Sequence, residues 1–434
     1  MELGRTIKYY RMKRNMTQAE LAEGVCSIPH LSKIENNIYQ ANHGTATLLL
    51  KRLGVDIEDE YAQYTEIKRE LEQFIEAIQF VDVTEANRLM DVLSNKEYII
   101  ARTNLINTFH LYMMRYHLMH GHTTLASEQR IILDQNRTNL TAIEELSYKL
   151  FNGILLVGRN RFRAATNILL ELQNEDYSSK YLFVREVAFF LSQCYTQMDE
   201  PEKATVYAKE ALYIFKQEDN YIRAFHTQML LGINYTQMNM VEESTRLYKV
   251  LLRNTRLFGH ENLYHQALYN YGILLKKMGT YEQSQQCFSD CLTFFEKESQ
   301  NYVVCLLASA EVLFHMQAEK ERIQLLINEI YQISTSRGLK RLGLQAKYLH
   351  LRLKSGDEMY GFIEEELLPH LEKADNQSEP LPYALELADW YQSNGDYEKA
   401  NEYLKKYVLI SKKGSDRCCN RAPLKLQPEH SESR

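Results

Sequence analysis

A block of sequence recurs three times in the middle of the chain at an offset of 40 residues. The copies occupy residues 191–198, 231–238 and 271–278. The same offset continues downstream through Ala204, Ser244 and Ser284, then Ala208, Tyr248 and Phe288, then Ala211, Leu251 and Cys291. Small residues at fixed places let two helices approach closely, and an aromatic residue fills the space between successive pairs. The pattern therefore predicts stacked helical hairpins, each touching only its neighbours.

The repeat resembles the tetratricopeptide repeat, whose first-helix signature Leu-Gly-x2-Tyr stands intact at residues 231–235. The offset of 40 exceeds the usual ~34 residues, so we expect longer helices. Weaker copies occupy residues 153–172 upstream and extend downstream through Ala310 to residues 387–407, with a weak signature over 340–372. One or two poorer copies are expected over residues 73–130, with Ala86 in a second helix. The resemblance implies about eight or nine hairpins wound into a superhelix with a concave face.

A different pattern occupies residues 17–35. Thr17 and Glu20 have the spacing of a capping box at the start of one short helix. Ser27 is suited to cap a second helix whose first turn contains Pro29, and Gly24 lies between them. Leu31 and Ile34 would point inward. Two short helices joined by such a turn predict a helix-turn-helix, whose second helix would lie in the DNA major groove.

The flanking residues make this prediction more specific. The pattern Ile7-x3-Arg11-x5-Thr17-Gln18-x2-Leu21-Ala22-x9-Ser32-x-Ile34-Glu35 resembles the XRE (Cro/repressor-type) DNA-binding domain over about the first 55 residues. The resemblance implies that Arg11 pairs with Glu35 and that Gln18 contacts phosphate. The usual Gly and Pro after the recognition helix are absent, which indicates a variant loop. The expected DNA-binding residues are Gln18, Ser27, Ile28, His30, Ser32 and Lys33.

Charge and composition agree with a small DNA-binding part on a larger body. The whole chain has a formal net charge of −6, yet residues 1–53 carry eight Lys or Arg against four Glu, a local charge of +4. A basic end on an acidic body suits phosphate contact at one end only. No apolar run is long enough to span a bilayer, and the start has no signal-peptide pattern, so a cytoplasmic location is expected.

The sequence thus predicts an all-α chain of four parts. Residues 1–55 form the helix-turn-helix domain, 56–72 a charged connecting helix, 73–412 the repeat body and 413–434 a disordered tail or cloning scar. First helices of such repeats line the inner surface. The residues expected to bind a peptide there are Gln193, Gln197, Gln237, Gln266, Asn270, Lys277 and Glu311, because amide groups can bond an extended backbone and Lys277 can meet a carboxylate.

Enzymatic and cofactor chemistry find no support in the sequence. There is no Walker loop, HExxH, Gly-x-Ser-x-Gly or CxxC motif, so we expect no catalytic residues, no metal and no cofactor. Cys287 and Cys291 lie one helical turn apart, and His117, His120 and His122 cluster near Gly121. Both groups are expected to be structural, although a redox-sensing role for Cys194, Cys287, Cys291 or Cys305 stays open as an alternative.

An XRE-type domain followed by a tetratricopeptide-like body of this length resembles the Rap–NprR–PlcR–PrgX group of peptide-pheromone receptors, in its PlcR and NprR branch. The resemblance covers about residues 1–410. It implies a cytoplasmic homodimer that reads a palindromic double-stranded DNA operator and is gated by a short signalling peptide on the concave face. The alternatives are an adaptor that sequesters a partner protein, as Rap-like members do, or a metabolite- or redox-responsive regulator.

Overall fold

The computed structural model describes residues 3–36, 38–173, 181–373, 375 and 379–415. These residues contain helices and no strand, which confirms the all-α prediction. The chain divides into two compact units. The first unit comprises Met1–Leu191 and Ala211–Ala224, and the second comprises Ser192–Glu210 and Phe225–Arg434. Each unit is described by itself below.

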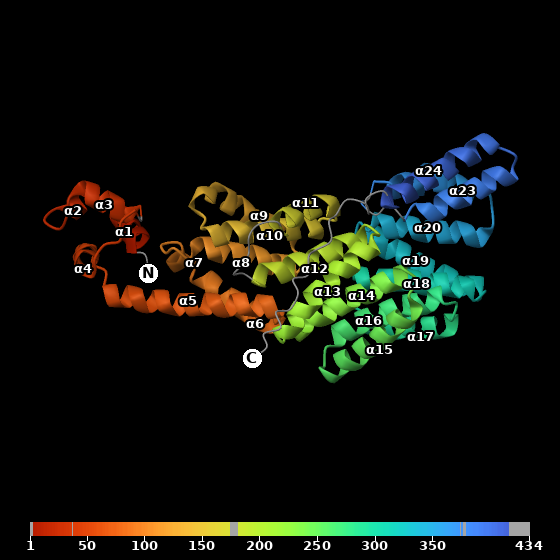
Figure 1. The fold of residues 1–434 in the computed structure, drawn as a ribbon, viewed down its shortest axis with the longest axis horizontal. Helices are drawn as coiled ribbons and strands as arrows, with labels where there is room; N and C mark the ends of the chain where they lie inside the picture. The colour runs from red at the N-terminus through yellow and green to blue at the C-terminus, as the bar shows by residue number, and fades with distance from the viewer. Residues whose placement is uncertain (1–2, 37, 174–180, 374, 376–378, 416–434) are drawn as a thin grey trace, which may run out of the picture. The chain divides into compact units, whose positions relative to one another are not determined.

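The head consists of four helices of the first unit that surround one small core (Figure 1). They are α1 (Leu3–Lys13), α2 (Gln18–Ala22), α3 (Ile28–Glu35) and α4 (His43–Arg52). The predicted caps are present, because Thr17 and Glu20 form a capping box and the Ser27 hydroxyl accepts from the His30 N–H. Helix α4 begins at His43, because the Asn42 side chain caps it by accepting from the Thr45 N–H.

The rest of the first unit is built of consecutive antiparallel helix pairs (Figure 1). Its helices are α5 (Ile57–Phe80), α6 (Val83–Asn95), α7 (Glu97–Ile100), α8 (Ile106–Met119), α9 (Thr123–Gln135), the 3-10 turn η1 (Arg137–Asn139), α10 (Ala142–Gly158), α11 (Phe162–Gln173) and the first part of α12 (Tyr181–Gln197). The connecting helix expected over 56–72 is the first part of α5. This helix continues to Phe80 and packs against α6 through Phe74, Ala86 and Leu89, so it is also the first helix of the first hairpin.

The second unit continues the pairing. Its helices are α13 (Pro201–Gln217, whose end belongs to the first unit), α14 (Tyr221–Gln237), α15 (Val241–Leu257), α16 (Glu261–Lys277), α17 (Tyr281–Phe294), α18 (Gln300–His315), α19 (Lys320–Ser336), α20 (Lys340–Lys354), α21 (Glu358–Phe362), the π-helix η2 (Ile363–Leu367), α22 (Leu368–Leu371), α23 (Leu381–Ser393) and α24 (Tyr397–Ser415). Helices α12, α14 and α16 begin 40 residues apart and each has 17 residues. Longer helices therefore account for the long period, as expected. Within the predicted tail of residues 413–434, α24 ends at Ser415 and residues 416–434 lie outside the described part.

The small residues of the repeat mark close helix contacts. An added Cβ at Gly232 would lie 2.7 Å from the Tyr248 ring, and one at Gly272 would lie 2.8 Å from the Phe288 ring. Tyr248 and Phe288 are fully buried. The neighbouring hydroxyls repeat as well, since Ser244 Oγ lies 3.1 Å from the Gly232 carbonyl and Ser284 Oγ lies 2.8 Å from the Gly272 carbonyl. The recurring small–aromatic pair is thus a packing device of each hairpin.

We predict that Gly272→Ala lowers the free energy of unfolding of the second unit by about 1–3 kcal/mol, because the buried Phe288 ring has no free space to move into. The control is Gly361→Ala in the exposed part of α21, where an added Cβ meets nothing within 4 Å and better helix propensity should stabilise slightly. Urea denaturation of the full chain compares the two. Equal stability of both variants would show that the hairpin tolerates a wider spacing at this point.

Candidate functional site

Helix α3 presents one buried and one exposed face, as the sequence predicts for a recognition helix. Leu31 and Ile34 are fully buried in the head core with Ile7 and Leu21. On the opposite face Ser27, Ile28 and Lys33 are exposed, and His30 and Ser32 are half-buried. The predicted DNA-contacting residues of α3 therefore share an accessible surface, and their contacts with DNA remain a prediction.

The ion pair expected between α1 and α3 is present. Arg11 Nε lies 2.6 Å from Glu35 Oε1, and Arg11 Nη2 lies 2.9 Å from Glu35 Oε2. This two-pronged pair fixes the end of α3 against α1. The hydrogen bond to Glu35 raises the pKa of Arg11. Gln18, predicted to contact phosphate, donates its amide Nε2–H to Glu35 Oε2 at 2.8 Å, so only the rest of its amide group is available to DNA.

The loop after α3 carries two exposed residues that the sequence motif did not single out. The N–H groups of Ile38 and Tyr39 both donate to the Lys33 carbonyl, at 2.9 and 3.2 Å. Ile38 is 74% exposed, and the Tyr39 ring meets the His30 ring edge-on with centroids 4.9 Å apart. The signal that could have identified Tyr39 in the sequence is an aromatic residue in a loop that departs from the family pattern. Tyr39 therefore orients the predicted base-contacting residue His30.

A buried polar cluster joins the head to the first hairpin within the first unit. Arg102 Nη2 lies 3.0 Å from Glu60 Oε1 and donates to Gln63 Oε1 at 2.8 Å, and both ion-pair side chains are almost fully buried. Tyr10 of α1 donates its hydroxyl to Glu60 Oε1 at 2.8 Å and accepts from Arg102. Burial and the Glu60 hydrogen bond raise the pKa of Tyr10 to about 12. The Thr6 hydroxyl adds a bond to the Arg102 carbonyl at 3.2 Å.

The residues predicted to bind a peptide lie on α12, α14, α16 and α18 of the second unit. Gln197 and Lys277 are exposed, whereas Gln193, Gln237, Gln266, Asn270 and Glu311 are half-buried. Several already have protein partners. Gln266 donates to Asn262, Asn270 donates to the Gln266 carbonyl, and Lys277 Nζ lies 2.7 Å from the Thr236 carbonyl. Glu311 pairs with Lys276 at 2.6 Å. The role of all seven in peptide binding stays a prediction.

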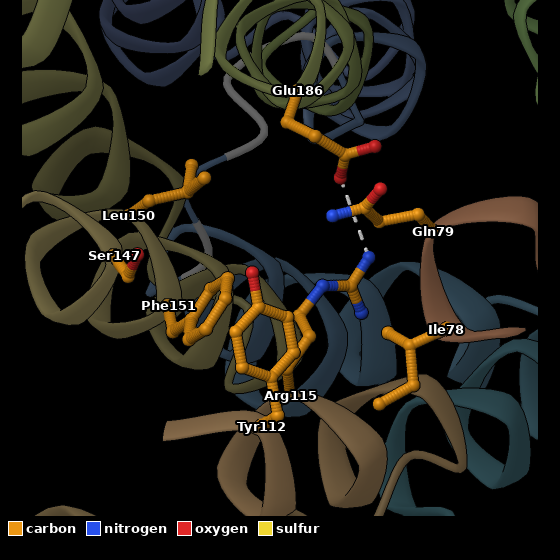
Figure 2. Close-up of a pocket in the computed structure, with 8 residues that line it drawn as sticks. All are labelled: Ile78, Gln79, Tyr112, Arg115, Ser147, Leu150, Phe151 and Glu186. Carbon is orange, nitrogen blue, oxygen red and sulfur yellow. Dashed lines mark hydrogen bonds and ion pairs between the residues drawn. The ribbon is translucent and has the colours of Figure 1, made fainter. Parts of the chain in front are cut away.

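A cavity lies elsewhere, inside the first unit (Figure 2). It encloses about 370 Å³ of empty space, part of it open to solvent. Its lining comes from the first helices of four hairpins, namely Ile78 and Gln79 of α5, Tyr112 and Arg115 of α8, Ser147, Leu150 and Phe151 of α10, and Glu186 of α12. Inner surfaces built from first helices are what the repeat pattern predicts. The individual residues were missed, because they lie outside the 40-residue copies.

Charged side chains surround Glu186 at this cavity. Glu186 Oε2 lies 2.9 Å from Arg223 Nη2 and 3.4 Å from Arg115 Nη2, and Arg185 pairs with Glu218. Burial opposes ionisation of Glu186, but Arg223, Arg115 and Arg185 outweigh it and lower the pKa of Glu186. Burial also raises the pKa of the neighbouring Tyr112. The cavity is therefore lined by a carboxylate that arginines surround and by the apolar side chains of Ile78, Leu150 and Phe151.

Three of the described cysteines have raised pKa values, and His117 has a lowered one. Burial raises the pKa of Cys287 to about 11. Burial also raises the pKa of Cys26, and the hydrogen bond with Cys305 raises the pKa of Cys291. Raised thiol pKa values disfavour the thiolate that redox chemistry needs. Burial lowers the pKa of His117, and the described residues form no group of His, Cys, Asp and Glu that could hold a metal. Cys418 and Cys419 lie outside the described part.

Protein families match both the N-terminal head and parts of the repeats. Residues 7–59 match the helix-turn-helix family, and residues 265–297 and 382–413 match the tetratricopeptide repeat. The latter ranges correspond to α16–α17 and α23–α24. Among the described residues, no helix is long and apolar enough to cross a membrane.

The similarity to individual proteins extends over most of the chain. "Transcriptional activator NprA" of Geobacillus stearothermophilus is 21% identical over 89% of this chain and 97% of its own length. "Regulatory protein RapD" of Bacillus subtilis (strain 168) is 24% identical over 66% of this chain and 84% of its own length. The structure of NprR in complex with its cognate peptide NprX has a TM-score of 0.67 at 21% identity, covering 80% of this chain and 99% of that one. These findings confirm the predicted fold and the resemblance on which the prediction of family rests.

Proposed function

We propose that this chain is a peptide-gated transcriptional regulator of the Rap–NprR–PlcR–PrgX family, which binds DNA through α3 and a short signalling peptide through its repeats. The observation that carries the DNA-binding half is the head itself, in which the Arg11–Glu35 pair and the buried Leu31 and Ile34 hold α3 with its opposite face free. A supported helix with an accessible face is what reading a major groove requires. The peptide half is supported by the likeness to NprR with its bound peptide.

We further propose that the chain is not an enzyme, acts in the cytoplasm and works as a homodimer on a palindromic operator. Two symmetry-related heads would read two half-sites, so the operator symmetry would mirror that of the protein. The similarity to RapD is the observation that supports the alternative, an adaptor that sequesters a partner protein. The helix-turn-helix match over residues 7–59 favours DNA binding over that alternative.

Helix α5 offers a physical route between the two activities. Near its beginning Glu60 holds Arg102 and Tyr10, and near its end Ile78 and Gln79 line the cavity. Residues 60 and 79 of one helix are separated by about 28 Å at 1.5 Å per residue. A ligand that prefers one placement of the end of α5 would therefore bias the placement of the head, which is the differential contact that gating requires.

We predict that His30→Ala combined with Lys33→Ala weakens operator binding about ten-fold or more, because a base-edge contact and a phosphate contact are lost together. The slope of log affinity against log salt concentration should also fall by about one, because one phosphate contact is lost. Fluorescence anisotropy with the selected operator measures both effects, and Lys209→Ala, which removes an exposed charge of α13 outside the head, is the matched control. Unchanged operator affinity in a folded double variant would mean that α3 is not the recognition helix.

A further inference from the structure

The first turn of α3 exposes two apolar side chains. Ile28 is 48% exposed, and the next residue, Pro29, is exposed as well. Among the described residues, Ile28 belongs neither to the head core nor to the side chains packed against it. A single exposed apolar residue is ordinary on a protein surface. This pair is informative because it occupies the N-terminal turn of the predicted recognition helix, and that turn contacts base edges in a helix-turn-helix.

The polar side chains beside this pair already have partners within the head. The Ser27 hydroxyl accepts from the His30 N–H at 3.3 Å as the helix cap. The His30 ring is half-buried and meets the Tyr39 ring edge-on, with centroids 4.9 Å apart. Neither Ile28 nor Pro29 has a side-chain donor or acceptor. The first turn of α3 therefore offers DNA a surface that is suited mainly to apolar contact.

The major groove offers one distinctive apolar group to such a surface. Thymine carries a methyl group on C5, whereas the other bases present nitrogen or oxygen donors and acceptors at their major-groove edges. An isoleucine placed against a carbonyl or an amino group removes water from it without supplying a hydrogen bond, which costs free energy. Against a thymine methyl group, the same contact removes apolar surface from water on both sides. An isoleucine at this place therefore favours thymine.

The surroundings of Ile28 are basic, which favours DNA over a second copy of the head as the partner of this surface. Residues 1–53 carry eight Lys or Arg against four Glu, so two heads repel each other and both attract the phosphate backbone. The exposed Lys33 lies five residues after Ile28 on α3, about 7.5 Å further along the helix at 1.5 Å per residue. The contacts of the two side chains can therefore be removed separately.

We propose that Ile28 reads the 5-methyl group of a thymine in the major groove of each operator half-site, while Pro29 helps to exclude water beside it. The inference rests on the proposed binding of DNA through α3 and specifies a base feature that one named side chain recognises. It adds a requirement to the operator. Each half-site contains a thymine that is recognised by its methyl group rather than by its hydrogen-bonding edge.

Replacement of thymine by deoxyuridine tests the proposal with the full chain, because deoxyuridine keeps the base pair and the O4 acceptor and lacks only the methyl group. Each thymine in one half-site of the selected operator is replaced in turn, and fluorescence anisotropy measures the affinity at a fixed salt concentration. We expect one position at which the affinity falls about four-fold, the value of one methyl group removed from burial. At that position 5-methylcytosine should bind more tightly than cytosine by a similar factor.

Three variants locate the effect at Ile28. Ile28→Ala should bind the thymine and deoxyuridine operators equally, because its shorter side chain no longer contacts the methyl group. Lys33→Ala should weaken both operators and keep the four-fold ratio between them. Leu48→Ala shortens a 54% exposed apolar side chain of α4 and is the matched control, which should keep both the affinity and the ratio. Thermal unfolding checks that each variant is folded, and Ile28→Ala should unfold as the wild type does, since Ile28 lies outside the core.

The outcomes separate this inference from the proposed function. An operator that is bound but tolerates deoxyuridine at every position, or that has no thymine in its half-sites, would overturn the inference while leaving DNA binding intact. A four-fold ratio that persists in Ile28→Ala would assign the methyl contact to another residue and would overturn it as well. Selection of no operator at all would overturn both the inference and the DNA-binding half of the proposed function.

Discussion

Replacing Arg11 with Ala should destabilise the head by about 3–5 kcal/mol. The substitution removes both prongs of the pair and leaves the Glu35 carboxylate in the core, where its side chain is 1% exposed. Gln18 alone would still donate to it. Hydrogen exchange of the α1 and α3 amides in the full chain reports the opening of the head separately from that of the repeats.

The control for this variant is Lys8→Ala, which removes an exposed charge from the same helix and should change stability by less than about 0.5 kcal/mol. If Arg11→Ala opened the head no more than the control, the Arg11–Glu35 pair would not be what holds α3. Because α3 carries the predicted base contacts, operator binding should be lost together with the protection of α3.

Replacing Glu186 with Gln should destabilise the first unit by about 3–5 kcal/mol, because Arg115 and Arg223 then lie buried without their common counterion. The double variant Glu186→Gln with Arg223→Met should recover part of the loss, since one of the uncompensated charges is removed. Urea denaturation measures both. Glu85→Gln in an exposed pair with Arg88 is the control and should cost about 0–1 kcal/mol.

The pH dependence of this effect follows from the lowered pKa of Glu186. A carboxyl group with a depressed pKa in the folded state contributes stability above its unfolded pKa of about 4.3, and that contribution is lost as the pH falls through the folded value. The stability difference between the wild type and Glu186→Gln should therefore be full at neutral pH and shrink below about pH 4.3. A difference that grows as the pH falls would contradict the assignment of an ionised Glu186.

The head could be predicted almost residue by residue because its contacts are local and belong to a specific motif. The helix caps made by Thr17, Glu20 and Ser27 use partners within one helical turn in the sequence. The Arg11–Glu35 pair spans more of the chain, and it was predicted from the family pattern alone. The repeats were predictable for a related reason, since Gly232 and Gly272 recur opposite Tyr248 and Phe288 at a fixed offset.

The cavity could not be predicted in the same way. Gln79, Arg115 and Glu186 are far apart in sequence and come from three different helices, so no spacing within one segment links them. An arginine or glutamate on the inner face of a helix also resembles a solvated position until its neighbours are known. The π-helix Ile363–Leu367, which lies between α21 and α22, likewise depends on tertiary packing, because its sequence reads as ordinary helix.

The most direct test of the account is DNA capture from the source genome with the full chain, with and without short peptides encoded near its gene. The account predicts one palindromic motif whose occupancy changes with one peptide. A motif that is captured equally with and without every peptide would contradict peptide gating while keeping the DNA-binding half. Capture of no motif under any condition would contradict the central claim that the head reads DNA.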